Sequence, residues 1–101
     1  MEEERRLIVW NTSTLDRFAD ELERLASFSY AKAEQVEGAV LDCLQQAVDM
    51  PERYAKDQYK RNNPGHYRAF EIEDYRISYR HDKKQIRVLR VQHIRQKPLY
   101  Y

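Results

Sequence analysis

The spacing of apolar residues changes once along this chain, and that change constrains the fold more than any other feature. Between residues 13 and 48, apolar residues recur at three- and four-residue steps, which is the spacing of one face of an α-helix. From residue 67 onward, apolar and aromatic residues alternate with polar ones, many of them Arg, which is the period of a half-buried strand. Helices followed by strands are typical of an α+β fold.

Two amphipathic helices are expected in the first half. The first is Ser13–Ser27, with Ser13 and Asp16 as a weak form of the capping box. Ser29 can cap the second helix, and Pro51 disfavours helical geometry in the residue before it, so that helix ends there. Gly38 inside the second helix predicts close contact with the first. The expected buried stripes are Leu15, Phe18, Ala19, Leu22, Leu25 and Ala26, then Ala33, Val36, Val40, Leu44, Ala47 and Val48.

Four strands are expected around these helices. They are Leu7–Trp10, Tyr67–Ile72, Tyr75–Arg80 and Ile86–His93. In the last strand, Val88 and Leu89 break the alternation, which we interpret as a central strand buried on both faces. The expected order is β-α-α-β-β-β, in a small twisted sheet with the helical hairpin packed on one face. The opposite face is then partly open and carries Arg76 and Arg80.

Length and composition limit the class of protein. A chain of 101 residues is expected to form a single domain over residues 1–101. It contains no apolar run long enough to cross a membrane, and the start MEEERRLIVW lacks the apolar region of a signal peptide. Cys43 is the only cysteine, so no internal disulfide is possible and a cytoplasmic location is expected.

The charge is divided unevenly along the chain. Residues 1–50 contain 5 basic and 11 acidic residues, whereas residues 51–101 contain 13 basic and 6 acidic ones. A basic half favours an anionic or acidic partner. The alternative is that the arginines of the sheet form salt bridges with the acidic helices.

The element order and the C-terminal block resemble the RelE/ParE superfamily, the toxin components of bacterial type II toxin–antitoxin modules. The opening Val9–Trp10 before an acidic amphipathic helix is also similar to this family. The ending RVLRVQHIRQKP is closer to ParE-like and plasmid-stabilisation proteins than to RelE-like ones. The matching residues include Arg68, Phe70, Ile72, Tyr75–Tyr79, Ile86, Val88–Val91, His93, Arg95 and Pro98.

The resemblance implies a fold, a partner and a choice of targets. The fold is a small antiparallel-rich sheet with a helical hairpin, and the partner is a cognate antitoxin that silences the toxin. RelE-like members cut messenger RNA on the ribosome, whereas ParE-like members inhibit DNA gyrase and need no nuclease site. The ending favours the ParE-like branch. A third hypothesis is a module of the same fold that binds its partner without being toxic.

The nuclease alternative would depend on His93, Arg80 and Tyr100. RNA cleavage requires groups that move protons and a group that holds the charge on the phosphorane. Arg is suited to the second role because its planar fork matches phosphate oxygens. However, no Glu is evidently placed as a base on the open face, and His93 also fits a structural role at a strand end. Tyr100 and Tyr101 are suited to stacking on bases, but terminal aromatic residues more often close over the core or are disordered.

The residues expected to bind the target or the antitoxin are basic. In the connection before the sheet, Lys56, Lys60 and Arg61 interleave with Tyr54 and Tyr59. This pattern is compatible with stacking on nucleic-acid bases and equally with an antitoxin interface, where Tyr and Arg are favoured anchors. His66 and His81 are expected in turns, and Cys43 in the core. Three dispersed histidines and one cysteine indicate no metal site, and no motif calls for a cofactor. The expected binding residues are Lys60, Arg61, Arg68, Arg76 and Arg95.

Overall fold

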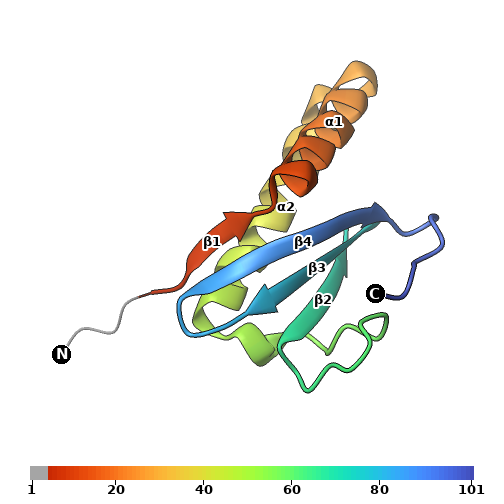
Figure 1. The fold of residues 1–101 in the computed structure, drawn as a ribbon. Helices are drawn as coiled ribbons and strands as arrows, with labels where there is room; N and C mark the ends of the chain where they lie inside the picture. The colour runs from red at the N-terminus through yellow and green to blue at the C-terminus, as the bar shows by residue number, and fades with distance from the viewer. Residues whose placement is uncertain (1–4) are drawn as a thin grey trace.

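The computed structural model describes residues 5–101, so the acidic residues 2–4 of the N-terminal stretch lie outside the described part. The elements follow the expected β-α-α-β-β-β order (Figure 1). They are β1 (Leu7–Trp10), α1 (Thr12–Phe28), α2 (Tyr30–Asp49), the short 3-10 turn η1 (Pro51–Arg53), β2 (Tyr67–Ile72), β3 (Tyr75–His81) and β4 (Gln85–His93). Within residues 5–101, neither helix is long and apolar enough to cross a membrane.

The four strands form one sheet in the order β1-β4-β3-β2. β1 pairs with β4 in parallel, and the other two pairings are antiparallel. The turn between β2 and β3 is tight because Glu73 and Asp74 both adopt positive φ angles, 53° and 69°, the geometry of a two-residue hairpin that matches the twist of its strands. The expected mainly antiparallel α+β fold is confirmed.

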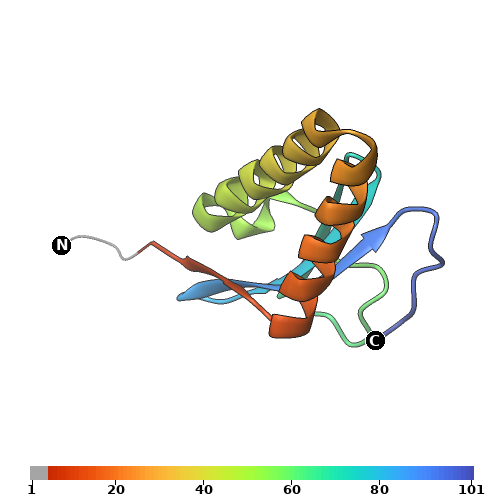
Figure 2. The ribbon, with the colours of Figure 1, turned by 90° about the horizontal axis from the view of Figure 1, so that it is seen from above.

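The helical hairpin packs on one side of the sheet. Figure 2 shows α2 across one face, while the C-terminal tail and the segment before β2 lie on the other side. Every expected stripe residue of α2 is buried. Of the expected stripe of α1 only Phe18 is fully buried, and Leu22 and Leu25 are partly buried against the core. Leu15 and Ala19 are exposed, contrary to expectation, and α1 packs against α2 and β4 rather than across the sheet.

The helix starts are only partly as expected. Ser29 caps α2, its hydroxyl accepting a hydrogen bond from the Lys32 amide at 3.2 Å. α1, however, begins at Thr12 with Asn11 at the cap position, so the expected Ser13 capping box is wrong. The Asn11 side chain does not cap the helix, because its oxygen accepts a hydrogen bond from Arg87 at 3.0 Å. Asn11 therefore ties the start of α1 to β4.

Gly38 does not mediate a close helix contact. It lies on an exposed part of α2, and an added Cβ would meet no atom within 4 Å. The expectation of close packing at this glycine is wrong. Phe18, Leu22 and Leu25 of α1 pack instead into or against the core cluster to which α2 contributes.

The break in alternation in β4 is a β-bulge. Tyr79 pairs with Val88 while Ser78 pairs with Arg90, so Leu89 is an extra residue in β4. The bulge puts Val88 and Val91 on the same face, where both are buried. β4 is central, as expected, but it is not buried on both faces, because Arg90 on the other side is half-buried.

The core lies between α2 and the helix-facing side of the sheet. Cys43 is half-buried and packs against it, as expected. The hydroxyl of the buried Tyr79 donates a hydrogen bond to the Pro51 carbonyl at 2.6 Å, which offsets the cost of burying a polar group. Burial raises the pKa of the Tyr79 hydroxyl far above its ordinary value. The main buried residues are Phe18, Val36, Val40, Leu44, Ala47, Val48, Phe70, Tyr75, Ile77, Tyr79, Ile86, Val88 and Val91.

Candidate functional site

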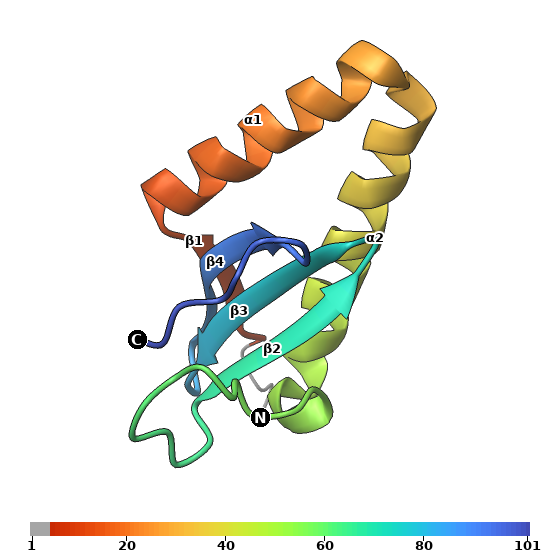
Figure 3. The same cartoon turned by 90° about the vertical axis from the view of Figure 1, so that its right-hand side faces the viewer.

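The sheet face opposite α2 is covered rather than open. Figure 3 shows the tail that follows β4 turning back across β4 and β3, with the loop before β2 beside it. The two segments are joined by backbone hydrogen bonds. The Tyr101 amide donates to the Tyr59 carbonyl at 2.9 Å, and the Arg61 amide donates to the Tyr101 carbonyl at 2.7 Å. The loop and the tail therefore cover the sheet together.

Asp57 lies at the centre of this cover, with a side chain that is 0% exposed. Its Oδ1 accepts from Arg76 at 2.9 Å and from the Tyr59 amide at 3.0 Å, and its Oδ2 accepts from the Tyr101 hydroxyl at 2.6 Å. Burial by itself raises the pKa of the Asp57 carboxyl. The bonds from Tyr101, the Tyr59 amide and Arg76 outweigh it and hold the pKa below its ordinary value.

Aromatic rings complete the arrangement around Asp57. The Arg76 guanidinium lies 4.8 Å from the ring centroid of Tyr59, and that of Arg90 lies 4.6 Å from the ring centroid of Tyr101. Arg90 also donates to the Leu99 carbonyl at 2.8 Å. We refer to these five residues, Asp57, Tyr59, Arg76, Arg90 and Tyr101, as the clasp, since they hold the tail against the sheet.

Because of the clasp, the arginine-rich face of the sheet is not open. Arg76 was expected on an open face, but its side chain is only 11% exposed and pairs with Asp57 and, at 3.4 Å, with Glu71. Both carboxylates belong to the basic half of the chain, so Arg76 does not pair with the acidic helices. Arg80 is more accessible and pairs weakly with Asp82 at 3.7 Å.

Arg68 lies on the opposite face from Arg76, because it stands across from Tyr79 on the core side of the sheet. Its guanidinium donates to the Gly65 carbonyl at 2.9 Å and to the Tyr54 carbonyl at 3.1 Å. Gly65 has a φ of 136°, which favours glycine, and an added Cβ would lie 3.2 Å from Arg68. Arg68 thus braces the loop before β2 and is not part of the clasp.

The three residues of the nuclease alternative do not come together. His93 pairs with Tyr75 at one end of the β3–β4 ladder, and Arg80 pairs with Arg87 near the other end. Five residue steps along a strand correspond to about 17 Å. The His93 ring packs on Tyr75 at 5.3 Å, and its Nδ1 accepts from the Arg95 amide at 3.1 Å.

Tyr100 packs against the loop before β2. Its ring makes an edge contact with Tyr59 at 5.5 Å, and its side of the tail is exposed. Of the expected binding residues, Arg61 and Arg95 are exposed, while Lys60 is half-buried with its ammonium 4.8 Å from the ring centroid of Tyr67. These exposed basic residues lie along the loop and the tail.

His81 is not in a turn, contrary to expectation. It ends β3, is buried, and its Nε2 lies 3.1 Å from the Gly65 carbonyl. Burial lowers the pKa of the His81 ring below its ordinary value, with a smaller contribution from nearby Arg68. The His66 ring is 6.0 Å away, in the loop as expected. His66 and His81 together help to hold the loop before β2 against β3.

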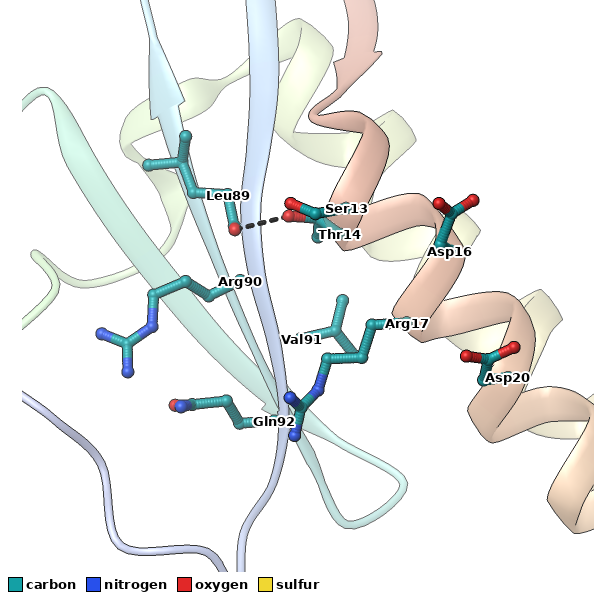
Figure 4. Close-up of a pocket in the computed structure, with 9 residues that line it drawn as sticks. All are labelled: Ser13, Thr14, Asp16, Arg17, Asp20, Leu89, Arg90, Val91 and Gln92. Atoms are coloured by element: carbon teal, nitrogen blue, oxygen red, sulfur yellow. Dashed lines mark hydrogen bonds between the residues drawn. The ribbon is translucent and has the colours of Figure 1, made fainter.

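A cleft of about 510 Å³ separates α1 from the C-terminal half of β4. Figure 4 shows α1 facing β4 across it, with Arg17 reaching from α1 toward Gln92. The Thr14 hydroxyl donates to the Leu89 carbonyl at 2.7 Å and closes one end. The lining residues are Ser13, Thr14, Asp16, Arg17 and Asp20 from α1, and Leu89, Arg90, Val91 and Gln92 from β4.

Three features of the site, namely Asp57, the cleft and the contact of Tyr101 with Asp57, were missed from the sequence. Asp57 carries a signal, because it is the only acidic residue in the basic stretch 53–61. The cleft has a weaker signal in the broken alternation at Val88 and Leu89, which marks the bulge beside it. Tyr101 offers none, because its role depends on contact with Asp57, 44 residues away.

Fold and site together define a small α+β domain with a clasped tail, exposed basic residues and no assembled acid–base group at the candidate residues. The family described as "ParE toxin of type II toxin-antitoxin system, parDE" matches residues 13–98. The chain therefore belongs to the ParE toxin family, and the resemblance to the RelE/ParE superfamily is confirmed. Membership implies a cognate antitoxin partner. No curated protein matches the chain.

Proposed function

We propose that this protein arrests bacterial growth in the cytoplasm by binding and inhibiting DNA gyrase, and that its cognate antitoxin neutralises it. Membership of the ParE toxin family supports the toxin role. The separation of His93 from Arg80 along the β3–β4 ladder is the observation that favours DNA gyrase over messenger RNA as the target. An acid–base group must reach the proton that it moves within about 3 Å. Residues at opposite ends of two paired strands do not act on one phosphate.

The arginines of the covered face also support binding over nuclease chemistry. Arg76 is engaged by Asp57 and Glu71, and Arg90 by the Leu99 carbonyl. Neither guanidinium is presented to a phosphate. The clasp uses the positive charge of this face to hold the tail.

The tail itself offers a contact surface for the target. Leu99 is 68% exposed and Tyr100 61% exposed. Arg95 and Arg61 are exposed as well, on the tail and the loop. Aromatic and Arg side chains in such a cluster are favoured anchors of protein interfaces. The backbone hydrogen bonds between the loop and the tail hold the segments that carry these side chains together.

Expression in bacteria tests this proposal. Growth should stop, plasmid recovered from arrested cells should be relaxed, and total mRNA should stay intact. Co-expression of the cognate antitoxin should restore growth. Cleaved mRNA with unchanged plasmid supercoiling would instead support the nuclease alternative. Normal growth with the antitoxin still bound would support the non-toxic module.

Substitutions at the nuclease candidates sharpen the test. His93→Ala and Arg80→Ala should each retain growth arrest, because neither residue performs chemistry in gyrase inhibition. The matched control is His66→Ala, which changes an exposed loop histidine. Circular dichroism should show that all three variants are folded. Loss of arrest in folded His93→Ala and Arg80→Ala, with arrest retained in His66→Ala, would contradict the proposal.

A further inference from the structure

The sheet has two outer edges, and only one of them is covered by the chain. The loop before β2 runs along the β2 edge, where the Ala69 amide donates to the Ala55 carbonyl at 3.1 Å. β1 is the strand at the other edge. Within residues 5–101, no segment pairs with the outer side of β1, and in Figure 2 no other ribbon passes in front of it. The β1 edge is therefore unpaired.

The backbone of β1 directs two of its residues toward this edge. The Leu7 amide donates to the Lys84 carbonyl at 2.9 Å, and the Asn11 amide donates to a β4 carbonyl at 3.3 Å, so both residues face β4. Successive residues of a strand direct their backbone groups to opposite edges. The N–H and C=O groups of Ile8 and Trp10 therefore face outward. Among the described residues, no backbone hydrogen bond outside the β1–β4 ladder involves either of them.

The β1 strand carries no residue that would prevent association. Proteins protect free edges with charged side chains or proline, and Leu7–Trp10 contains neither. Leu7 is 70% exposed, whereas Ile8, Val9 and Trp10 are half-buried. A cleft of about 260 Å³ lies beside the strand, between β1 and the C-terminal half of α2. An uncharged and partly exposed edge strand of this kind is a template for pairing with another chain.

A second copy of the same strand matches this edge. Two β1 strands that run antiparallel about a twofold axis at Val9 place Ile8 of each copy opposite Trp10 of the other. As hydrogen-bonded pairs, they join the two outward N–H groups of each copy to the two outward C=O groups of the other. Val9 then lies opposite Val9 of the second copy, with the exposed Leu7 diagonal to it on the same face. Pairing thus satisfies the outward groups and covers apolar surface on both copies.

The charges at the two ends of β1 favour the antiparallel arrangement. Arg5 and Arg6 precede the strand, and Asp16 lies near the start of α1, which follows it. Antiparallel pairing puts the basic start of each strand beside the start of α1 in the other copy. Asp16 is exposed and takes part in no salt bridge within the described residues. Arg5 can pair with it, because the side chains of Arg5 and Asp49 are 66% and 71% exposed and such a surface pair contributes little.

We propose that two copies of this protein form a twofold-symmetric homodimer, in which the β1 strands pair antiparallel about Val9 and join the two sheets into one. This inference goes beyond the proposed inhibition of gyrase and does not depend on it. The strand contact is short, so the dimer is weak and forms at high protein concentration. Its register is specific, because only pairing about Val9 brings the outward groups of Ile8 and Trp10 together.

Engineered cysteines test the register of the two strands. Val9→Cys is made together with Cys43→Ala, which removes the only native cysteine. It should form a covalent dimer under mild oxidation, because non-hydrogen-bonded partners have Cα atoms about 4.5 Å apart, within reach of a disulfide. Leu7→Cys in the same background is the matched control. The two Leu7 positions are offset by about 14 Å along the paired strands, so this variant should stay monomeric.

The outcomes of this experiment separate the proposal from its alternatives. A covalent dimer of Val9→Cys alone supports antiparallel pairing about Val9. Equal cross-linking of both cysteine variants would indicate random collision and would overturn the proposal. Absence of cross-linking in Val9→Cys, or cross-linking of Leu7→Cys alone, would overturn it as well.

Charges placed at Val9 test the association without a covalent bond. In sedimentation at about 0.1 mM, the unmodified protein should show a mass above that of the monomer. Val9→Lys and Val9→Glu should each stay monomeric, because like charges would lie directly opposite, and an equimolar mixture of the two should recover the dimer. Circular dichroism checks that both variants are folded. A monomeric unmodified protein, or a mixture of folded variants that stays monomeric, would contradict the paired strands.

Discussion

At the scale of single residues, Asp57 contributes most to the covered face. One buried carboxylate joins the loop through Tyr59, the sheet through Arg76 and the tail through Tyr101. A buried charge is tolerated only when it is paired and hydrogen-bonded. Because all three partners donate to Asp57, loss of its charge weakens the whole clasp.

We predict that Asp57→Asn lowers the free energy of unfolding by about 2–4 kcal/mol, because it leaves Arg76 largely buried beside a neutral amide. Urea denaturation measures this change. Glu71→Gln is the matched control, since Glu71 also pairs with Arg76 but is 59% exposed. It should change stability by about 0.5 kcal/mol or less. Equal effects of the two substitutions would show that the clasp is not the main restraint.

The pH dependence of stability should follow the lowered pKa of Asp57. Because its pKa in the folded state lies below the ordinary value of 3.8, the unfolded chain binds the proton more readily. The stabilisation is therefore fully present above that ordinary value and is lost as pH falls toward the folded pKa. Unfolding measured across this acidic range should show a shallower pH dependence in Asp57→Asn. An unchanged slope would contradict the role given to Asp57.

At the scale of secondary-structure elements, local patterns predicted most of the fold. The strands, the stripe of α2, the Ser29 cap and the β2–β3 turn depend on neighbouring residues, so the sequence alone indicates them. The bulge at Leu89 was detected as a broken pattern but misinterpreted. Burial on both faces and an inserted residue give the same local sequence, and only the register with β3 separates them.

Thr14→Val should reveal how α1 is held to β4. It removes the hydroxyl that bonds the Leu89 carbonyl while keeping the size of the buried side chain. We expect a loss of about 1–2 kcal/mol in unfolding free energy, because the carbonyl loses its partner. Thr12→Val, at an exposed position in the same turn, should be close to neutral. Chemical denaturation of both variants makes the comparison, and a neutral Thr14→Val would contradict this anchor.

At the scale of the whole molecule, the basic half is partly neutralised from within itself. The sequence predicted a basic, open sheet face, but long-range contacts among the loop, sheet and tail could not be inferred from local spacing. Asp57 and Glu71 form salt bridges with Arg76, and the Leu99 carbonyl of the tail accepts a hydrogen bond from Arg90. The exposed basic residues of this half lie in the loop and tail, such as Arg61 and Arg95, and in the β3–β4 turn, Lys83 and Lys84. The distance between the nuclease candidates His93 and Arg80 depends on strand register, so it too could not be inferred from local spacing.

Inhibition of purified DNA gyrase tests the central claim most directly. We predict that equimolar toxin abolishes ATP-dependent supercoiling of relaxed plasmid, and that toxin carrying both His93→Ala and Arg80→Ala does so equally well. Prior mixing with the cognate antitoxin should restore supercoiling. Undiminished supercoiling at equimolar folded toxin would contradict the account.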